Sequence, residues 1–327
     1  MSKFSKLDVN MIMGKLTQRV SAQQYNMVGS KVFPTINTTR KTGDIMSMGL
    51  ENLRLPKDGG KRAPGTAPKY SDYTMTKKNL YAMTQYCHGY LLPEEDLEDA
   101  AELSKLMEGT SALRPFQIAK DFLLDKVSLS KEKLVADIVR DPAQYDASHV
   151  DTPAKLWSAA DSTPIKDIRI ARGIIEDDTH GFESDTLVMG RDVYRTLLVN
   201  PEIKSIILFL KLKSEKEIIS NLPEILGVKN IYVGNAQIIT SEDGVTPEVA
   251  TRIWEKDCFV FFDNPNGTVE TNSKTFGKTF QYPTRNGKSF KQFFDEEIDS
   301  WKIKIKDEND IAVVDPLTGF LLDDVIA

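Results

Sequence analysis

Two Gly-Lys-hydroxyl triplets, Gly277-Lys278-Thr279 and Gly287-Lys288-Ser289, have the residue types of a phosphate-binding loop. Each matches the end of the pattern G-x-x-x-x-G-K-[ST], in which backbone amides surround the phosphates of a nucleotide. The glycine that should open the pattern is absent, because Asn272 and Tyr282 stand at those positions. A side chain there would keep the backbone away from a phosphate, so the sequence predicts no nucleotide site.

Cysteine and histidine, the usual nucleophile and base, are few and scattered: Cys87, Cys258, His88, His149 and His180. Neighbouring residues of a strand point to opposite faces, so Cys87 and His88 cannot act together as nucleophile and base. Neither cysteine has the spacing of a metal-ligand set. We predict two buried, structural thiols, no catalytic residues, no metal and no cofactor.

An acidic run, Glu94-Glu95-Asp96 followed by Glu98, comes directly after Pro93. Proline is favoured at the first position of a helix, and acids there complement the helix dipole. No histidine follows on the same face, which argues against a metal site. We predict that these acids form a docking surface for a basic partner.

Basic residues gather in a segment rich in glycine and proline, from about 55 to 65. They are Lys57, Lys61 and Arg62, with Lys69 just beyond. Tyr70 is the one aromatic residue close by, whereas proteins that bind single-stranded nucleic acid use several aromatic rings to stack successive bases. We therefore predict contact with another subunit in preference to contact with nucleic acid.

The first half of the chain is predicted to be an extended arm, a hairpin and helices. Residues 1 to about 45 lack sustained helical periodicity. From about 45 to 90, two strand-like flanks enclose the basic segment, which predicts a projecting hairpin too polar to be stable by itself. A helix begins at Pro93. Apolar spacing over 111–140 predicts one long helix, or two in series with a break near Ser128–Ser130.

Beyond Asp151 shorter alternating elements predict a mixed α/β or α+β unit. The predicted helices begin at Pro164 and cover 191–199 and 216–226. The predicted strands cover 186–189, 231–233 and 257–262. Residues 300–305 and 311–314 are interpreted as a terminal hairpin.

Composition excludes several classes of protein. The chain has 327 residues, 40% of them hydrophobic, and a net charge of −6, which is typical of a globular fold. No apolar stretch approaches the ~18 residues of a membrane span, and the N-terminus does not have the pattern of a signal peptide. Residues 1–80 carry a formal charge of +9 and the remainder −15. This asymmetry suggests attraction between copies of the chain, or between the basic part and nucleic acid.

The order of these elements resembles the major capsid proteins of tailed bacteriophages, which share the Hong Kong ninety-seven type fold. Short phrases agree with these proteins along about 290 residues. They are Val32-Phe33-Pro34, Arg62-Ala63-Pro64-Gly65, Leu156-Trp157 before Pro164-Ile165, Thr186–Gly190 before the helix at Arg191, Val228, Val233-Gly234, Trp254, Asp315 and Gly319.

The resemblance implies an α+β fold with an N-terminal arm, an extended loop, a peripheral domain with a long spine helix, and an axial domain. Placed on this sequence, the segments are residues 1–45 for the arm, 46–92 for the extended loop, 93–160 for the peripheral domain with its spine helix, 161–255 for the axial domain, and 256–327 for the return strands of the peripheral domain.

The implied function is structural and not enzymatic. Such subunits assemble into hexamers and pentamers that form an icosahedral shell around double-stranded DNA without sequence-specific binding. The implied location is the virion capsid, assembled in the host cytoplasm. The implied partners are other copies of the chain, a separate scaffolding protein, because no long helical leader precedes the arm, and a portal, with a decoration protein as a further candidate.

Some relatives crosslink a loop lysine to an asparagine of a neighbour. Lys57 and Lys61 are placed as donors, but no acceptor asparagine or activating acid can be named, so this chemistry is not predicted. The charge asymmetry suggests instead that the basic arm and loop of one subunit lie over the acidic helix of the next.

Two rival functions remain. One is an encapsulin-like nanocompartment shell that carries protein cargo, although such shells tend to lack a loop and arm of this length. The other is a soluble α/β enzyme with a ligand site within 161–255. A sequence-specific DNA-binding protein is disfavoured, because no recognition helix is evident and the overall charge is negative.

Overall fold

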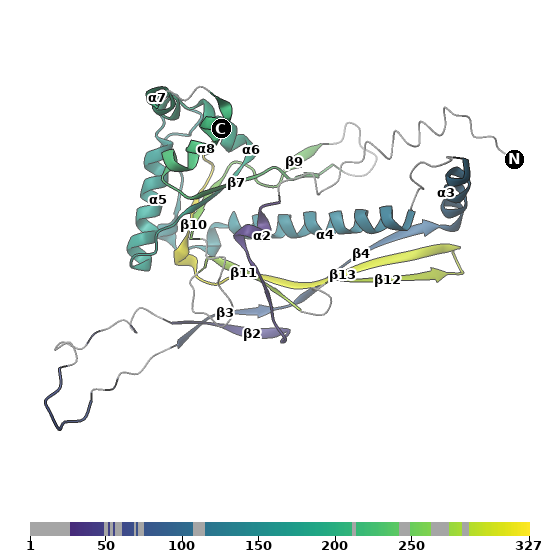
Figure 1. Ribbon diagram of the computed structural model, residues 1–327, viewed down its shortest axis with the longest axis horizontal. Helices are drawn as coiled ribbons and strands as arrows, with labels where there is room; N and C mark the ends of the chain where they lie inside the picture. Colours follow the sequence, from purple (N-terminus) through teal and green to yellow (C-terminus); the bar gives the residue numbers. More distant parts are fainter. Residues whose placement is uncertain are drawn as a thin grey trace.

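The computed structural model describes residues 27–48, 52, 55, 61–68, 70, 75–106, 115–210, 214–241, 249–262, 275–282 and 288–327. The molecule is elongated, with a compact unit at one end, a long helix beside a long sheet, and a projecting hairpin (Figure 1). The arm residues 1–26 and the basic residues Lys57 and Lys69 lie outside the described residues.

The long sheet has strand order β1-β11-β13-β12, and β4 pairs with the other side of β13. Strand β1 runs parallel to β11, and the other pairs in this sheet are antiparallel. The strands are β1 (Thr35–Asn37), β4 (Thr84–Pro93), β11 (Gly277–Gln281), β12 (Lys288–Asp295) and β13 (Ser300–Val313).

The prediction of a terminal hairpin over 300–314 was wrong, because β13 is one continuous strand of 14 residues. Its period of two continues through the polar middle, where Asp307 and Asn309 are buried on the same face as Ile303 and Ile305. The sequence prediction placed a turn at these polar residues. In the structure they are buried because α4 covers their face and β4 pairs beside β13, and both elements are distant in sequence. The actual hairpin joins β12 to β13.

Helix α4 (Pro115–Val139) lies along the long sheet as one uninterrupted helix of 25 residues. The predicted alternative of two helices broken near Ser128–Ser130 was therefore wrong. Leu123 and Val127 of α4 pack against Ile303 and Ile305 of β13, so burial stabilises the helix where local propensity is weak. The shorter α3 (Glu94–Leu106) precedes it.

The compact unit is built on a sheet of order β5-β14-β10-β6-β7, and its helices pack around a core that includes Ile168, Leu187 and Phe320. Its strands are β5 (Val150–Asp151), β6 (Thr186–Gly190), β7 (Asn230–Gly234), β10 (Cys258–Phe261) and β14 (Gly319–Leu322). Its helices are α5 (Pro164–Thr179), α6 (Arg191–Val199), α7 (Pro201–Phe209) and α8 (Glu215–Leu226).

Most elements of this unit confirm the sequence predictions, and α6 has the predicted bounds. Helix α7 was missed, although its start signal is present in the sequence. The Asn200 side chain accepts a hydrogen bond from the Glu202 amide, and Pro201 occupies the first turn.

The projecting hairpin consists of β2 (Thr42–Met48) and β3 (Met75–Ala82), which pair antiparallel as predicted. The segment before it holds the short helix α2 (Gly29–Val32), so the described part of the predicted extended arm is not uniformly extended. A small antiparallel pair, β8 (Gln237–Ile239) and β9 (Ala250–Arg252), completes the fold.

Candidate assembly surfaces

The base of the projecting hairpin is fixed to the long sheet. The Tyr81 ring stacks on Phe280 with centroids 4.3 Å apart, and its hydroxyl lies 3.1 Å from the Thr38 hydroxyl. The Ala82 amide donates to Asp310 at 2.8 Å. These contacts hold β3 against the strands of the sheet, so the hairpin leaves the body in a set direction.

The basic tip of the hairpin is exposed where the structure describes it. Lys61 and Arg62 are both exposed, and a turn follows in which the Thr66 amide donates to the Ala63 carbonyl. Tyr70, on the return side, is 87% exposed. An aromatic ring exposed in this way is typical of a surface that meets a partner.

The predicted acidic residues Glu94, Glu95, Asp96 and Glu98, here called the α3 acids, are all exposed at the start of α3. The Glu94 amide donates to the Asp299 carbonyl at 3.1 Å, which fixes this helix to the turn between β12 and β13. The turn brings Glu296, Glu297 and Asp299, here called the turn acids, to the same end of the molecule.

Sequence reasoning missed the turn acids. They are exposed and lie about 200 residues from the α3 acids in the chain. The sequence signal was a local cluster, Asp295-Glu296-Glu297-Ile298-Asp299, which is a typical polar turn between strands. Its link to the α3 acids depends on a strand pairing that the sequence prediction did not include.

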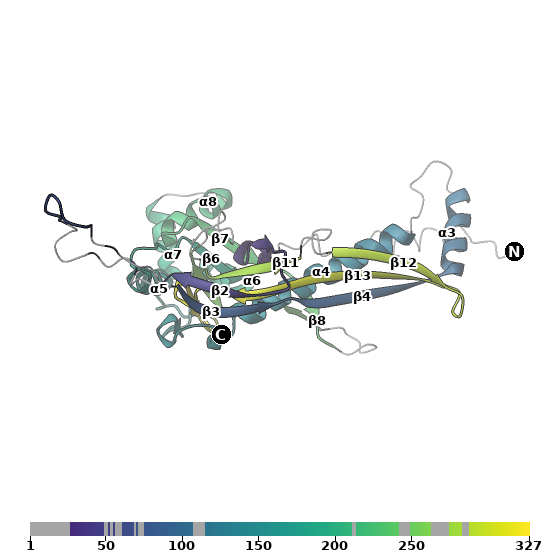
Figure 2. The same cartoon turned by 90° about the horizontal axis from the view of Figure 1, so that it is seen from below.

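The basic tip and the α3 acids do not meet within one chain. Both views place residues 61–68 of the hairpin loop and α3 at opposite ends of the long axis (Figures 1 and 2). The charges of opposite sign are therefore available to contact other molecules.

The root of the arm is anchored by a buried carboxylate. Glu132 of α4 is 3% exposed and accepts hydrogen bonds from the amides of Val28 at 2.9 Å and Gly29 at 2.8 Å. It also accepts one from the indole nitrogen of Trp254 at 2.7 Å. Three donors on one buried carboxylate compensate for its desolvation, and together they join the segment at Val28 and Gly29 to helix α4 and to Trp254.

The candidate phosphate triplets do not form a phosphate site. Gly277-Lys278-Thr279 lies within the buried strand β11, and a Cβ on Gly277 would be 1.8 Å from the Phe33 ring. This glycine is therefore a packing residue. Gly287 of the second triplet lies outside the described residues, and Lys288 begins β12.

The two cysteines differ in exposure, so the prediction that both are buried was wrong. Cys258 is fully buried, and burial raises the pKa of its thiol far above the usual value. Cys87 is exposed, because it lies on the face of β4 opposite α4. His88, its neighbour, pairs with Ile305 on the face that α4 covers, in agreement with the predicted alternation.

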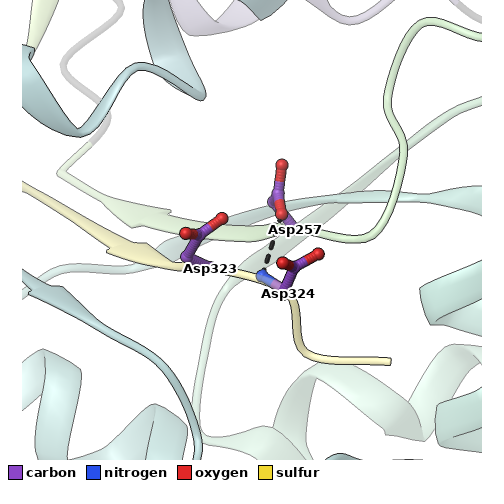
Figure 3. A group of neighbouring side chains, drawn as sticks. All are labelled: Asp257, Asp323 and Asp324. Atoms are coloured by element: carbon purple, nitrogen blue, oxygen red, sulfur yellow. Dashed lines mark hydrogen bonds between the residues drawn. The ribbon is translucent and has the colours of Figure 1, made fainter. Parts of the chain in front are cut away.

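Asp257, Asp323 and Asp324 form the one group of three potential metal ligands within the described residues (Figure 3). Arg140 donates to one Asp257 oxygen at 2.5 Å, and the Asp324 amide donates to the other at 3.0 Å. Burial and the nearby Asp257 raise the pKa of Asp323. Because both Asp257 oxygens are already engaged, the group is better explained as a fastening for the C-terminal segment.

An open cavity of about 460 Å³ lies between α5 and α8, in the region assigned to the enzyme alternative. Three of the charged groups that line it are engaged in the fold. Lys229 pairs with Asp185 at 3.0 Å, and the Arg172 side chain donates to the Ser184 carbonyl at 2.9 Å. Ser220 donates to carbonyls of its own helix. The lining therefore presents no paired nucleophile and base.

No helix among the described residues is both long and apolar enough to cross a membrane.

No protein-family model matches the chain. A curated relative, the "Major capsid protein" of Burkholderia phage BcepMu, is 26% identical over 229 residues, which cover 67% of each chain. The level of identity and the length of the match identify the BcepMu protein as a homologue of this chain.

Solved structures of phage proteins have the same fold. A phage-related protein from Bordetella bronchiseptica matches with a TM-score of 0.69 at 24% identity, covering 93% of this chain and 95% of its own. The capsid protein of cyanophage P-SCSP1u matches with a TM-score of 0.56 at 10% identity, covering 100% and 93%. The chain therefore has the Hong Kong ninety-seven type fold of tailed-phage capsid proteins, and its homologue and structural neighbours support a structural role in a capsid shell.

Proposed function

We propose that this chain is a major capsid protein whose copies assemble into hexamers and pentamers and close into an icosahedral shell around double-stranded DNA. The observation that carries the proposal is the separation of complementary surfaces. A fixed hairpin presents exposed cations at one end of the molecule, and exposed acids occupy the other end. One copy cannot bring them together, whereas neighbouring copies can.

In this proposal the hairpin of one subunit lies across its neighbour, with Lys57, Lys61, Arg62 and Lys69 near the α3 acids. Exposed charge pairs contribute modestly to affinity but steer association and fix its register. Raising the salt concentration should therefore slow shell formation. Assembly rates independent of salt would contradict this contact.

A second contact is proposed at the end of α7. Leu208 is 78% exposed and Phe209 is 84% exposed, at the outer end of the compact unit. Adjacent large apolar side chains exposed in this way are typical of surfaces that become buried in an assembly. We assign this end to contacts around the axis of each ring, the role of an axial domain.

The segments assigned above as arm, loop, axial and peripheral domains keep those roles in the proposal. The proposal also includes a scaffolding protein, a portal and a decoration protein as partners, and assembly in the host cytoplasm. The protein is proposed to have no catalytic activity, because the homologue and the structural neighbours are capsid proteins.

The test is negative-stain electron microscopy with light scattering on the recombinant full chain, with and without its scaffolding protein. Closed shells, tubes, or rings of five or six subunits are expected. A persistent dimer or tetramer under all conditions would overturn the proposal and favour the enzyme alternative.

The nanocompartment alternative has one observation in its favour. A virus-like particle from Pyrococcus furiosus matches with a TM-score of 0.50 at 12% identity over 99% of this chain. The fold alone therefore fits either purpose. The contents of particles purified from the native source distinguish them: DNA supports the phage capsid, and protein cargo supports the nanocompartment.

A further inference from the structure

One face of the long sheet is open in the single subunit. In β13, Ile303 and Ile305 face α4, so the residues between them face the other way. Strand pairing places Lys302 level with Leu91 of β4 and Phe293 of β12 on that other face. Figure 2 looks onto it, and no described element crosses β4, β13 and β12 there.

The middle of the open face is apolar. Leu91 is 54% exposed and Phe293 is 43% exposed, on either side of Lys302. The Lys302 ammonium pairs with Asp295, so its charge is compensated within the subunit. These three residues form what we call the apolar row.

On one side of the apolar row lie three lysines, here called the lysine group: Lys304, Lys306 and Lys291, which pairs with Lys304 across the strands. None of them forms an ion pair with a described residue. The next acid on this face of β13, Glu308, is already engaged by Lys41 at 3.4 Å and Gln85 at 2.8 Å. The lysine group therefore presents three positive charges that no acid of the described residues compensates.

On the other side of the apolar row lie the turn acids, which form no ion pair with any part of the chain that the structure describes. Along a strand with a rise of ~3.3 Å per residue, Lys304 and Lys306 lie about 7 and 13 Å from Lys302. In the opposite direction β13 ends at Ser300, about 7 Å from Lys302, and the turn acids follow directly beyond it. Charges of opposite sign thus stand on either side of one apolar row.

We propose that the open face pairs with the same face of a second copy, around a two-fold axis that passes through the two apolar rows. The two apolar rows then cover each other. Each lysine group meets the turn acids of the other copy. This self-complementarity is what a two-fold interface requires, and an apolar centre with a charged rim is the usual anatomy of one.

A second copy fits this face better than nucleic acid does. Phosphates would neutralise the lysine group, but they would leave Leu91 and Phe293 in water and would be repelled by the turn acids. The Lys304 ammonium lies 5.0 Å from the centroid of the Phe293 ring, which leaves less of that ring for stacking on a base.

The symmetry of this contact places it between rings. Neighbours within a ring of five or six are related by rotation about the ring axis, so their contact joins two different surfaces. A two-fold contact joins identical surfaces and must link one ring to the next. The inference rests on the proposed function, in which such rings exist.

The test is charge reversal with rescue in the full chain. One variant carries Lys291→Glu, Lys304→Glu and Lys306→Glu, and a second carries Glu296→Lys, Glu297→Lys and Asp299→Lys. Each is expected to form rings but to lower the yield of closed shells by about tenfold or more, since like charges then face each other. A chain with all six substitutions restores the complementarity and is expected to recover shells to within about twofold of wild type.

A matched control carries Lys166→Glu, Lys216→Glu and Lys256→Glu, the same change of charge on exposed lysines of the compact unit. It should form shells normally. Failure of the six-substitution chain to recover would overturn the inference, as would loss of the rings themselves. So would normal shells from the lysine variant combined with lost binding of random-sequence duplex DNA, which would assign the face to nucleic acid. If wild type forms neither rings nor shells, the proposed function itself fails.

Discussion

The compact unit and the long sheet bury their residues in different ways. In the compact unit, helices surround a five-stranded sheet whose strands β6, β10 and β14 are buried along their whole length. The long sheet is covered by α4 on one face and is open on the other, where Cys87, Leu91 and Phe293 are exposed. The compact unit thus completes its core within one chain, whereas the long sheet reaches full burial only when another molecule covers it. Substitutions in the two regions should therefore affect different measurements.

The largest effect on subunit stability is expected in the compact unit. Ile168→Ala on α5 removes a fully buried side chain and should lower the free energy of unfolding by about 3 kcal/mol, the usual cost of the lost transfer energy and the cavity. Ile170→Ala is the matched control, because Ile170 lies on the same helix and is 47% exposed. Urea denaturation of both variants checks the difference, and equal losses would contradict this account of the core.

The second effect is expected where the arm joins the body. Glu132→Ala leaves the amides of Val28 and Gly29 and the Trp254 indole without their acceptor, which should cost about 2 kcal/mol. Hydrogen exchange should show faster exchange at the Val28 and Gly29 amides. Lys133→Ala, on the exposed side of the same helix, controls for helix propensity. Unchanged exchange at both amides would show that Glu132 does not hold the arm.

A smaller effect of opposite sign is expected at Asp323. Its pKa is raised, chiefly by burial and then by Asp257, so the folded state binds this proton more tightly than the unfolded state does. The carboxyl therefore destabilises the fold as pH rises through its unfolded and then its raised folded pKa. Asp323→Asn should stabilise the protein by about 0.5 kcal/mol at pH 7. The gain should vanish at low pH, and a gain independent of pH would refute the electrostatic cause.

The smallest effect on the subunit is expected at the hairpin tip. Deleting residues 56–64 should change the free energy of unfolding by less than about 0.5 kcal/mol, because a polar loop tip contributes little to a core. Shell assembly should fail nonetheless, as judged by light scattering. Normal shells from the deletion variant would show that the loop does not brace neighbouring subunits.

The elements predicted best from the sequence are those that a local pattern of apolar residues defines. Helix α6 was predicted with its bounds, and β6, β7 and β10 within about a residue, because their patterns of apolar residues suffice to define them. Lys61, Arg62 and the α3 acids are exposed, as charged clusters in a sequence usually are, and their role in contacts between subunits stays a prediction.

The sequence failed where burial comes from distant parts of the chain. Asp307 and Asn309 are interior residues of a long strand because α4 covers that face and β4 pairs beside it. Cys87 is exposed because the opposite face lacks such cover within the subunit. The turn acids lie at the same end of the molecule as the α3 acids because the Glu94 amide donates a hydrogen bond to the Asp299 carbonyl. In each case the deciding contact joins segments many residues apart, which local periodicity does not report.

The Glu132 anchor also defines a path for mechanical load. A pull on the chain at Val28 acts on the C-terminal third of α4 through this carboxylate, and through the same group on the Trp254 indole. Trp254 packs so closely on Gly234, at the end of β7, that a Cβ there would be 2.1 Å from its ring. Tension on the arm would therefore be transmitted along both the stiff helix and the central sheet of the compact unit, so that the subunit would resist it as one rigid body.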